Sequence, residues 1–316
     1  MENLSMDKKV YGALGISAIM SNWNANFDGT PKALNDGTIY GTDKALKFTM
    51  KRLWEQQGEN VLYIKSMKIV SEKNGQVSYV PKTLKERYEE IFHIDDLKKE
   101  KNTIEVMRNI MSLKDVKNFG ATFTEASHNF AIQGAVQIGQ GINFYENTVV
   151  NQEKILSPFK NANEKDAKQT SIGTKATVNE AHYLYPFTIN PLIYDKLQKL
   201  EITEGYTEKD YMDFKETALK SVSMYDSNTK QGCDNEFAIF IETEKDTYIP
   251  NILSYISLEE GENRMKYYSL SKEFVDLLEL LGSRILKVEI FYNPATVCVN
   301  HIDVAEFYNI ISREKL

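Results

Sequence analysis

The chain has 316 residues, of which 42% are hydrophobic and 26% are charged, and its net charge is −7. These values exclude a wholly disordered chain and are typical of one large globular domain or two. No stretch approaches the roughly 18 consecutive apolar residues of a membrane span, and the N-terminus lacks an apolar secretory segment. We therefore expect a soluble cytoplasmic protein with no membrane partner.

The charge is divided unevenly along the chain. Residues 195–316 hold 14 Lys and Arg against 23 Asp and Glu, a net charge of −9, which leaves 24 against 22, or +2, for residues 1–194. A polyanion bound to one face, and kept away from the other, would fit this division. Random variation of the surface would fit it equally well.

Alternation of residue types over residues 10–20 predicts a first strand whose two faces differ. We expect one face to join the core, and it carries Val10, Leu14, Ile16, Ala18 and Met20. The other face consists mostly of small residues. We expect it to lie exposed, because small side chains let a ligand backbone approach a sheet closely.

A long loop at residues 21–44 follows this strand and is rich in Asn, Gly and Lys, with Trp23 and Phe27 among them. A loop of this length in a compact domain is usually functional. Its amides can donate hydrogen bonds and its rings can stack. The composition indicates that this loop binds the backbone of a polyanion.

A helix is expected over residues 42–57, with Thr42 as its cap and Gly58 as its stop. The helical period gives it a buried stripe and a separate cationic one. The buried stripe is Leu46, Met50, Leu53 and Trp54, and the cationic stripe is Lys44, Lys47, Lys51 and Arg52, with Phe48 among them. A solvated face would explain the lysines equally well, but it would not explain Phe48.

The next segments predict a second strand at residues 60–70, a turn at 73–75 and a charged, helical insertion at 81–111. Residues 128–141 then alternate as a strand with an apolar underside and an amide-lined top. Such a top can bond sugar and phosphate groups without carrying charge.

A hairpin is expected over residues 143–184, with a lysine-bearing tip that has few large apolar residues. Because the tip cannot pack a core of its own, we expect it to project and to become ordered on a partner. A loop without a role remains the alternative.

The C-terminal third predicts helices at residues 207–223 and 271–281 and strands at 236–242 and 284–292. The first of these helices begins with a T-x-x-D capping pattern. The order of elements indicates an α+β fold of the split βαβ kind, built around an antiparallel sheet.

Sequence motifs for catalysis are few. The chain has no GxxxxGK[ST] phosphate loop and no G-x-S-x-G elbow, and its two cysteines and four histidines lack metal-binding spacing. We expect no cofactor, no metal and no catalytic residue. Asp36 is the one candidate, since a loop carboxylate can help a 2′-hydroxyl attack its own phosphate, but a turn-forming Asp before Gly37 is the simpler interpretation.

Several blocks in order resemble one protein family. They are NWNANFDGTPKALNDGTIYGTDKALKFTMKRLW, VKNFGATF, GAVQIGQG, SIGTK and NEAHYLYPF, which together span about residues 8–190. This series resembles the CRISPR-associated backbone subunit of type I Cascade surveillance complexes, in the form of subtype I-B, within the RAMP superfamily. The acidic C-terminal third fits the family plan without a sharp motif.

The resemblance implies a hand-like α+β fold. Its parts are an RRM-like (ferredoxin-like) antiparallel sheet as palm, at residues 1–71, 115–146 and 178–316, an inserted helical fingers region at 72–114, and a β-hairpin thumb at 147–177. The palm strands lack the aromatic motif with which an ordinary RRM stacks bases. We therefore do not expect base stacking by such a motif on the sheet.

The implied function is non-catalytic binding of guide crRNA in a ribonucleoprotein for antiviral defence. Copies would assemble head to tail along the spacer, and the RNA would pair with target DNA. Other implied partners are the remaining Cascade subunits and a recruited helicase-nuclease that makes the cut. The acidic third would lie away from the RNA or face a basic partner subunit.

A guide must be held whatever its sequence, so contacts to phosphate and 2′-hydroxyl groups are expected. The candidate RNA contacts are Asn22, Asn24, Asn26 and Lys32 in the loop, Lys44, Lys47, Lys51 and Arg52 on the helix, Gln137 and Gln140 on the amide-lined strand, and Phe159, Thr170, Ser171 and Lys175 on the thumb. Phe159 would wedge or stack where a base is displaced, or would pin the hairpin to a neighbour.

Two alternatives remain at this point. A backbone subunit of the type III kind would cut target RNA through a loop Asp, here Asp36 or Asp28. A guide-processing endonuclease of related fold would need a His or Tyr general base, and the chain has no clustered histidines.

Overall fold

The computed structural model describes residues 4–71, 75–156 and 172–316. Its helices are α1 (Asp43–Gln56), α2 (Leu84–Phe92), α3 (Thr103–Met111), α4 (Lys114–Phe119), α5 (Asp195–Lys199), α6 (Glu208–Ala218) and α7 (Lys272–Leu281). Its strands are β1 (Lys8–Ser21), β2 (Tyr40–Gly41), β3 (Met67–Ser71), β4 (Val77–Pro81), β5 (Gly120–Glu125), β6 (His128–Gln133), β7 (Val136–Ile138), β8 (Gly141–Asn143), β9 (Val150–Leu156), β10 (Ile172–Ile189), β11 (Cys233–Glu244), β12 (Ile256–Glu260), β13 (Lys266–Leu270), β14 (Ile285–Tyr292), β15 (Val297–Val299) and β16 (Glu306–Asn309).

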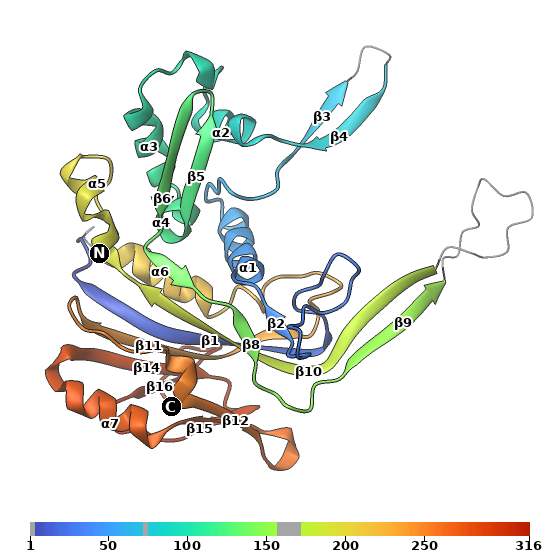
Figure 1. The fold of residues 1–316 in the computed structure, drawn as a ribbon, viewed down its shortest axis with the longest axis vertical. Coiled ribbons are helices and arrows are strands. Elements are labelled where there is room, and N and C mark those ends of the chain that lie inside the picture. The colour runs from blue at the N-terminus through green and yellow to red at the C-terminus, as the bar shows by residue number, and fades with distance from the viewer. Residues whose placement is uncertain (1–3, 72–74, 157–171) are drawn as a thin grey trace, which may run out of the picture.

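A nine-stranded sheet organises the molecule (Figure 1). Its strand order is β16-β14-β11-β1-β10-β8-β2, and β7 and β9 also pair with β10. β1 is antiparallel to both of its neighbours, β10 and β11, and only β16 pairs with this sheet in parallel among the described strands. The predicted α+β fold with an antiparallel sheet is confirmed.

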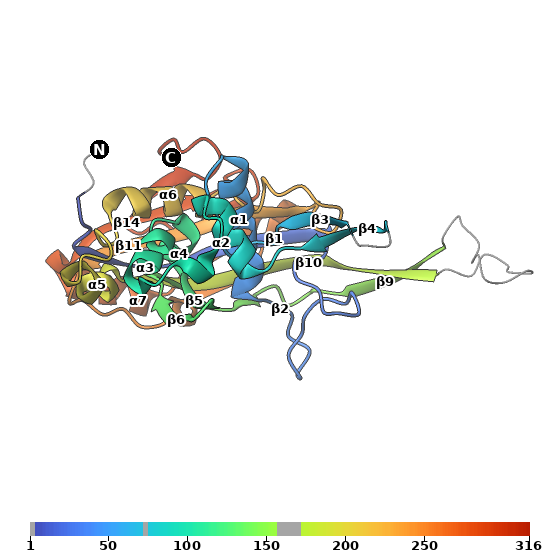
Figure 2. The same ribbon diagram turned by 90° about the horizontal axis from the view of Figure 1, so that it is seen from above.

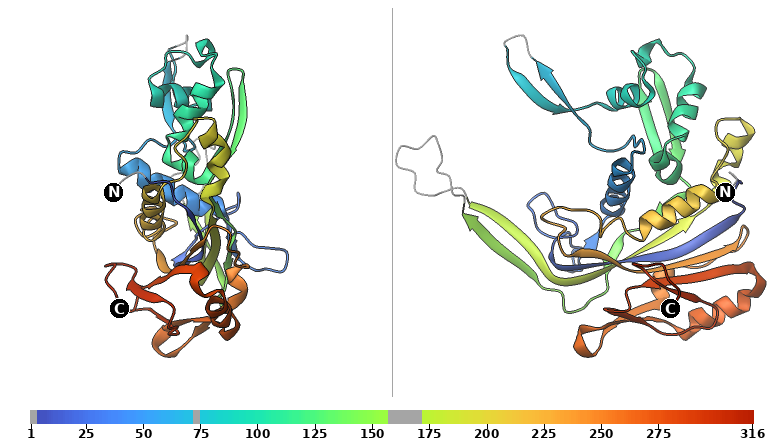
Figure 3. Two further views of the ribbon diagram at one scale, coloured as in Figure 1. Left: turned by 90° about the vertical axis from the view of Figure 1, so that its left-hand side faces the viewer. Right: turned by 180° about the vertical axis from the view of Figure 1, so that it is seen from behind.

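Both faces of the sheet are covered around β1. Helices α1 and α6 lie on one side of it, and α7 lies on the other (Figure 3). Val10, Leu14 and Ile16 belong to the core on the α1 side, whereas Ala13 belongs to a second core formed largely by the C-terminal third. The expectation that the small-residue face lies exposed is therefore wrong along the middle of β1. Met20, expected in the core, is 61% exposed at a position with positive φ.

Helix α1 is as expected from its sequence. Thr42 caps it by accepting a hydrogen bond from the backbone N–H of Ala45, and Leu46, Met50, Leu53 and Trp54 are buried. Gly58 lies just beyond its C-terminus with φ +86°, a conformation that glycine adopts at low cost.

The strand predicted at residues 60–70 forms only from Met67 onward, as β3, whose one partner among the described strands is β4. Backbone groups of residues 61–63 form hydrogen bonds with side chains instead. The carboxylate of Asp115 accepts the N–H groups of Leu62 and Tyr63, and the guanidinium of Arg87 donates to the carbonyl of Val61. Backbone groups committed in this way cannot join a strand ladder.

The strand predicted at residues 128–141 is broken at Gly134. Its first part is β6, which pairs with β5, and its second part is β7, which joins the main sheet. A Cβ at position 134 would lie 2.3 Å from the carbonyl oxygen of Asn118, so the chains meet too closely there for any residue but glycine. The amide-lined face persists in part, because Gln133 and Gln137 are exposed.

Strand β10 is the longest of the described strands and belongs both to a hairpin and to the main sheet. Its N-terminal end pairs with β9 as a hairpin, and the rest pairs with β1 inside the sheet. Figures 1 and 2 show this hairpin extending away from the body of the molecule. The predicted thumb residues Phe159, Thr170 and Ser171 lie outside the described residues.

The C-terminal helices and strands lie close to the positions expected from the sequence. Helix α6 begins with a capping box in which Thr207 and Asp210 bond each other's backbone N–H groups, and α7 begins after the Ser271 cap. Strands β11 and β14 pair antiparallel. No helix in the described part of the chain is long and apolar enough to cross a membrane.

A buried polar network connects β10 to the C-terminal third. His182 is 2% exposed, and its Nδ1 lies 2.7 Å from a carboxylate oxygen of Glu236 and its Nε2 lies 3.1 Å from one of Glu180. Lys266 pairs with Glu180 at 2.9 Å, and Tyr268 donates to Glu236. Burial acts to lower the pKa of His182, but the two carboxylates outweigh it and raise that pKa.

This network predicts pH-dependent stability. Because the pKa of His182 is raised on folding, its protonated form stabilises the fold below the unfolded pKa of about 6.5, and that stabilisation is lost as pH rises through the folded pKa. We expect His182→Gln to lower the free energy of unfolding by about 3 kcal/mol near pH 5.5 and by clearly less near pH 9. Urea denaturation at both pH values measures this difference.

His301→Gln is the matched control, because His301 is exposed and its described contacts are the exposed Asp303 and the ring of Phe307. It should change stability little at either pH. An equal loss for His182→Gln at both pH values would show that the imidazole contributes only by packing.

Candidate nucleic-acid interface

The loop between β1 and β2 projects from the sheet beside the root of the β9–β10 hairpin (Figure 2). Trp23 anchors it: the indole is buried and donates to the hydroxyl of Tyr185 on β10. Gly41 packs on both rings, since a Cβ there would lie 1.9 Å from that hydroxyl. The stacking role expected for Trp23 is therefore excluded, whereas Phe27 is fully exposed.

Two of the loop asparagines hold the loop itself. Asn22 is 4% exposed, and its amide donates to the carbonyls of Gly29 in the loop and Ala176 in β10. The side-chain oxygen of Asn24 accepts from the backbone N–H and hydroxyl of Thr42 at the start of α1. Asn22, predicted to contact RNA, has its side chain buried and bonded within the protein, and Asn24 is half-buried with its oxygen already bonded.

The outer part of the loop presents polar groups to solvent. Asn26 is exposed, and its side-chain oxygen accepts from the ammonium group of Lys32 at 3.1 Å. Asp28 and Asp36 are exposed and accept from the backbone N–H groups of Thr30 and Thr38. The hydroxyl of Thr30, and then its backbone N–H, lower the pKa of Asp28, and the backbone N–H of Thr38 lowers the pKa of Asp36. Such bonds are those of turn-forming aspartates.

The cations of α1 differ sharply in their environments. Lys44 is exposed, with no partner among the described residues, while Lys47 pairs with Asp43 at 2.9 Å and Arg52 pairs with Glu55. Phe48 contacts Tyr225 edge to face, which explains an aromatic residue on this face.

Lys51, another predicted RNA contact, is already bonded within the protein. Its ammonium group donates to the carbonyl of Tyr63 at 2.8 Å, and burial lowers its pKa. The nearby buried carboxylate of Asp115 acts in the opposite direction. Lys51 thus fastens residues 60–66 to α1.

Of the two amide-strand candidates, Gln140 lies near the start of α1. Gln140 is exposed, and its amide nitrogen is 3.4 Å from a carboxylate oxygen of Asp43. Gln137 is exposed on β7, where its amide nitrogen donates to the carbonyl of Gly134. On the thumb, Lys175 is half-buried and lies opposite Glu153 in the β9–β10 ladder.

Lys230 is a residue of this site that the sequence did not reveal. Its ammonium group donates to the carbonyls of Asn22 and Trp23 and lies over the Trp23 ring, 5.1 Å from the centroid. Burial lowers its pKa. Because it is about 200 positions from the loop in sequence, no local pattern could have placed it there.

The site therefore consists of an internally bonded loop, the first turn of α1, the β7–β8 edge and the root of the thumb. Its exposed groups are amides, single cations, a ring and the carboxylates of Asp28 and Asp36, which bond their own turns. No group of three His, Cys, Asp or Glu residues in the described part of the chain is placed to hold a metal ion. This chemistry suits binding of a polyanion.

Comparison with known proteins gives the family. A family model described as CRISPR-associated protein Cas7 matches residues 8–274. One solved chain, from a "CRISPR RNA-guided surveillance complex, pre-nicking", is 11% identical, covers 95% of this chain and 96% of its own, and superposes with a TM-score of 0.51. A second, from a "CRISPR RNA-guided surveillance complex", is 12% identical over 94% of each chain, with a TM-score of 0.48.

No curated protein matches the sequence. At 11% identity the structural likeness shows a shared fold and nothing finer. The family match, however, spans most of the sequence. The chain belongs to the Cas7 family of CRISPR-associated proteins.

Proposed function

We propose that this chain binds guide crRNA as a backbone subunit of a Cascade-type surveillance complex. The observation that carries the proposal is the convergence of the exposed loop, the first turn of α1 and the thumb root on one surface, in a chain of the Cas7 family. A solved chain of similar fold comes from an RNA-guided surveillance complex, which supports the same class of function.

The finer assignments belong to the proposal as well. They are subtype I-B, an RRM-like palm within the RAMP superfamily, fingers and thumb at the boundaries expected from the sequence, and a cytoplasmic location. The partners would be crRNA, neighbouring copies, other Cascade subunits, target DNA paired to the guide and a recruited helicase-nuclease. The acidic C-terminal third would face away from the RNA or toward a basic subunit.

Sequence-independent binding follows from the accessible groups. Lys32 and Lys44 can neutralise phosphates, and the amides of Asn26, Gln137 and Gln140 can bond phosphate or 2′-hydroxyl oxygens. None of these contacts requires a base edge, so the bases would stay free to pair. Lys47 and Arg52 would have to exchange their carboxylate partners for phosphate, and we expect them to contribute less.

We predict that Lys32→Glu combined with Lys44→Glu weakens binding of single-stranded RNA by on the order of tenfold or more in moderate salt, alike for unrelated sequences. Removing two phosphate contacts should also lower the slope of log affinity against log salt concentration by roughly 1 to 2. Fluorescence anisotropy titrations across a salt series measure both quantities. A loss confined to one RNA sequence would contradict the proposal.

Two control variants separate surface charge from structure. Lys272→Glu makes the same charge change at an exposed position of α7 and should leave RNA binding nearly unchanged. Lys51→Met removes a cation that bonds within the protein. It should lower stability while keeping the salt slope of the native chain.

We also propose that the chain is not a nuclease, which leaves the type III-like alternative to be tested. Asp28 and Asp36 already bond their own turns, which supports a structural role. The assembled complex, incubated with matched RNA and Mg²⁺, should leave that RNA intact on a denaturing gel. Regular cleavage that Asp36→Ala abolishes would establish the nuclease instead.

A further inference from the structure

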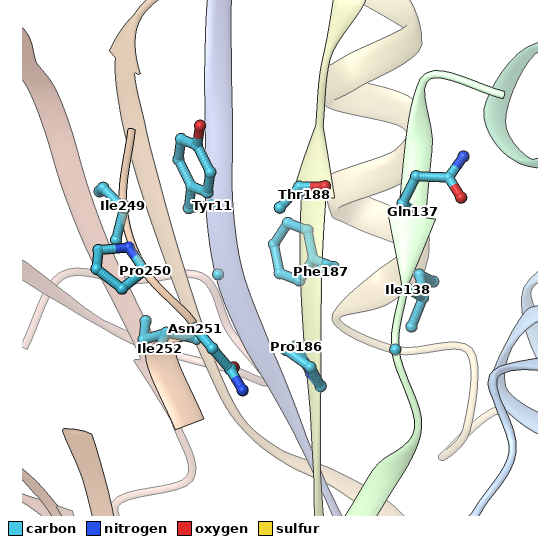
Figure 4. Close-up of a pocket in the computed structure, with 12 residues that line it drawn as sticks. Tyr11, Gln137, Ile138, Pro186, Phe187, Thr188, Ile249, Pro250, Asn251 and Ile252 are labelled. Carbon is cyan, nitrogen blue, oxygen red and sulfur yellow. The ribbon is translucent and has the colours of Figure 1, made fainter. Parts of the chain in front are cut away.

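The C-terminal third of the chain faces β10 along one side of the sheet, and the kind of contact changes along the strand. At the end far from the β9–β10 hairpin, residues 249–252 share a pocket of about 340 Å³ with Pro186 and Thr188 of β10 (Figure 4). In the middle of the strand, Leu184 is buried in the second core. At the hairpin end, ion pairs replace these apolar contacts.

Lys266 on β13 makes several of the contacts at the hairpin end. It is 2% exposed, and its ammonium group lies 2.9 Å from a carboxylate oxygen of Glu180 on β10 and 2.9 Å from one of Glu260 on β12. The same group lies over the ring of Tyr145, 4.9 Å from the centroid, in the connection between β8 and β9. One buried cation therefore joins both roots of the hairpin to the C-terminal third.

Tyr145 closes these contacts into a ring. Its hydroxyl donates to a carboxylate oxygen of Glu260 at 2.7 Å, and its ring meets the imidazole of His182 edge to face. His182 in turn lies 3.1 Å from the carboxylate of Glu180. The strand that enters the hairpin is thus held through Tyr145, and the strand that returns from it is held through Glu180 and His182.

The network is open on one side. A cavity of about 590 Å³ lies beside it, and Glu180, His182, Glu236 and Lys266 are among the residues that line this cavity. Side chains that border a cavity lack packing neighbours there, so ion pairs and hydrogen bonds must fix their positions. Burial acts to lower the pKa of Lys266, but its bonds to Glu260 and Glu180 outweigh burial and raise that pKa.

The hairpin has little other support at its root. β1 pairs with β10 only as far as Val178, and beyond that point β9 and β10 have only each other as partners among the described strands. A two-stranded ribbon is only marginally stable by itself. Pairing with β1 sets the direction in which β10 leaves the sheet, but it does not restrain the ribbon beyond Val178.

We propose that Lys266 is a positioning residue that holds the β9–β10 hairpin in one direction relative to the sheet. Its consequence for RNA rests on the proposed function: the acidic C-terminal third would support RNA binding without touching RNA, by keeping the hairpin in place beside the loop and α1.

The direction of the hairpin can be measured on the full chain with two spin labels. Lys154→Cys on β9 and Glu279→Cys on α7 place the labels at exposed positions, and Cys298→Ser removes the half-buried native thiol. Double electron–electron resonance should give a distance distribution about twofold broader for Lys266→Met, which removes the charge and keeps the apolar stem, than for the native network. An unchanged distribution would overturn the proposal.

Lys287→Met is the matched control. Lys287 also pairs with two carboxylates, those of Glu289 and Glu306, but it lies opposite Glu242, at the end of the sheet far from the hairpin. This variant should leave the distance distribution as it is in the native chain. Equal broadening for both variants would show a general loosening of the fold and would also overturn the proposal.

Two further variants test the role of charge at this position. Lys266→Arg restores a cation, for which the neighbouring cavity leaves room, and should return the distribution toward its native width. Equal broadening for Lys266→Arg and Lys266→Met would assign the effect to packing and would overturn the role of the cation. Tyr145→Phe removes only the bond to Glu260 and should broaden the distribution less than Lys266→Met, even where the latter folds poorly.

RNA binding distinguishes a positioning residue from a contact residue. Because Lys266 is buried, Lys266→Met removes no phosphate contact, and the slope of log affinity against log salt concentration should stay that of the native chain. We expect the affinity for single-stranded RNA to fall by about threefold to tenfold, since a mobile hairpin must be ordered on binding. A reduced slope would indicate a direct phosphate contact and would overturn the positioning role.

The two measurements also separate this inference from the proposed function. The distance distributions are recorded without RNA, so they decide the positioning role by themselves. A native chain that binds no RNA would overturn the proposed function, and with it the consequence for RNA. A hairpin that loosens in Lys266→Met while RNA affinity stays unchanged would overturn that consequence alone.

Discussion

The antiparallel pairing of β1 with β10 and β11 is the constraint on which the other parts depend. β1 lies between them with both faces covered, so its register is fixed on two edges and by two cores. β10 continues past the end of this pairing to become one strand of the β9–β10 hairpin. The direction in which this hairpin leaves the body is therefore set inside the core.

The loop after β1 uses much of its polar chemistry on itself. Asn22 bonds it to β10, Asn24 bonds it to α1, and Lys230 bonds its first carbonyl groups. A loop held at three points loses little conformational entropy when it binds a ligand. Under the proposed function, Asn22 and Asn24 would support binding by fixing the position of Asn26 and Lys32.

Local patterns in the sequence predicted the elements that depend on residues close together in the chain. The Thr42 cap, the buried stripe of α1 and the Thr207 capping box all follow from residues within one or two turns. Long-range contacts decided the rest. The burial of Lys51 depends on Tyr63 and on the distant Asp115, and the covering of Ala13 depends on the C-terminal third. A single sequence carries no local signal for either.

Contacts within the protein also reduce the number of cations that can bind a ligand below the number counted in the sequence. Residues 8–52 hold seven cationic side chains against three acidic ones, yet Lys47, Lys51 and Arg52 are bonded within the protein. Few cations of one copy are left for phosphate, so a single copy would hold RNA weakly. If copies bind along one strand as proposed, their contacts would add through effective concentration, which multiplies affinity without any stronger individual contact. Weak, sequence-independent contacts in each copy are therefore compatible with a tightly held guide.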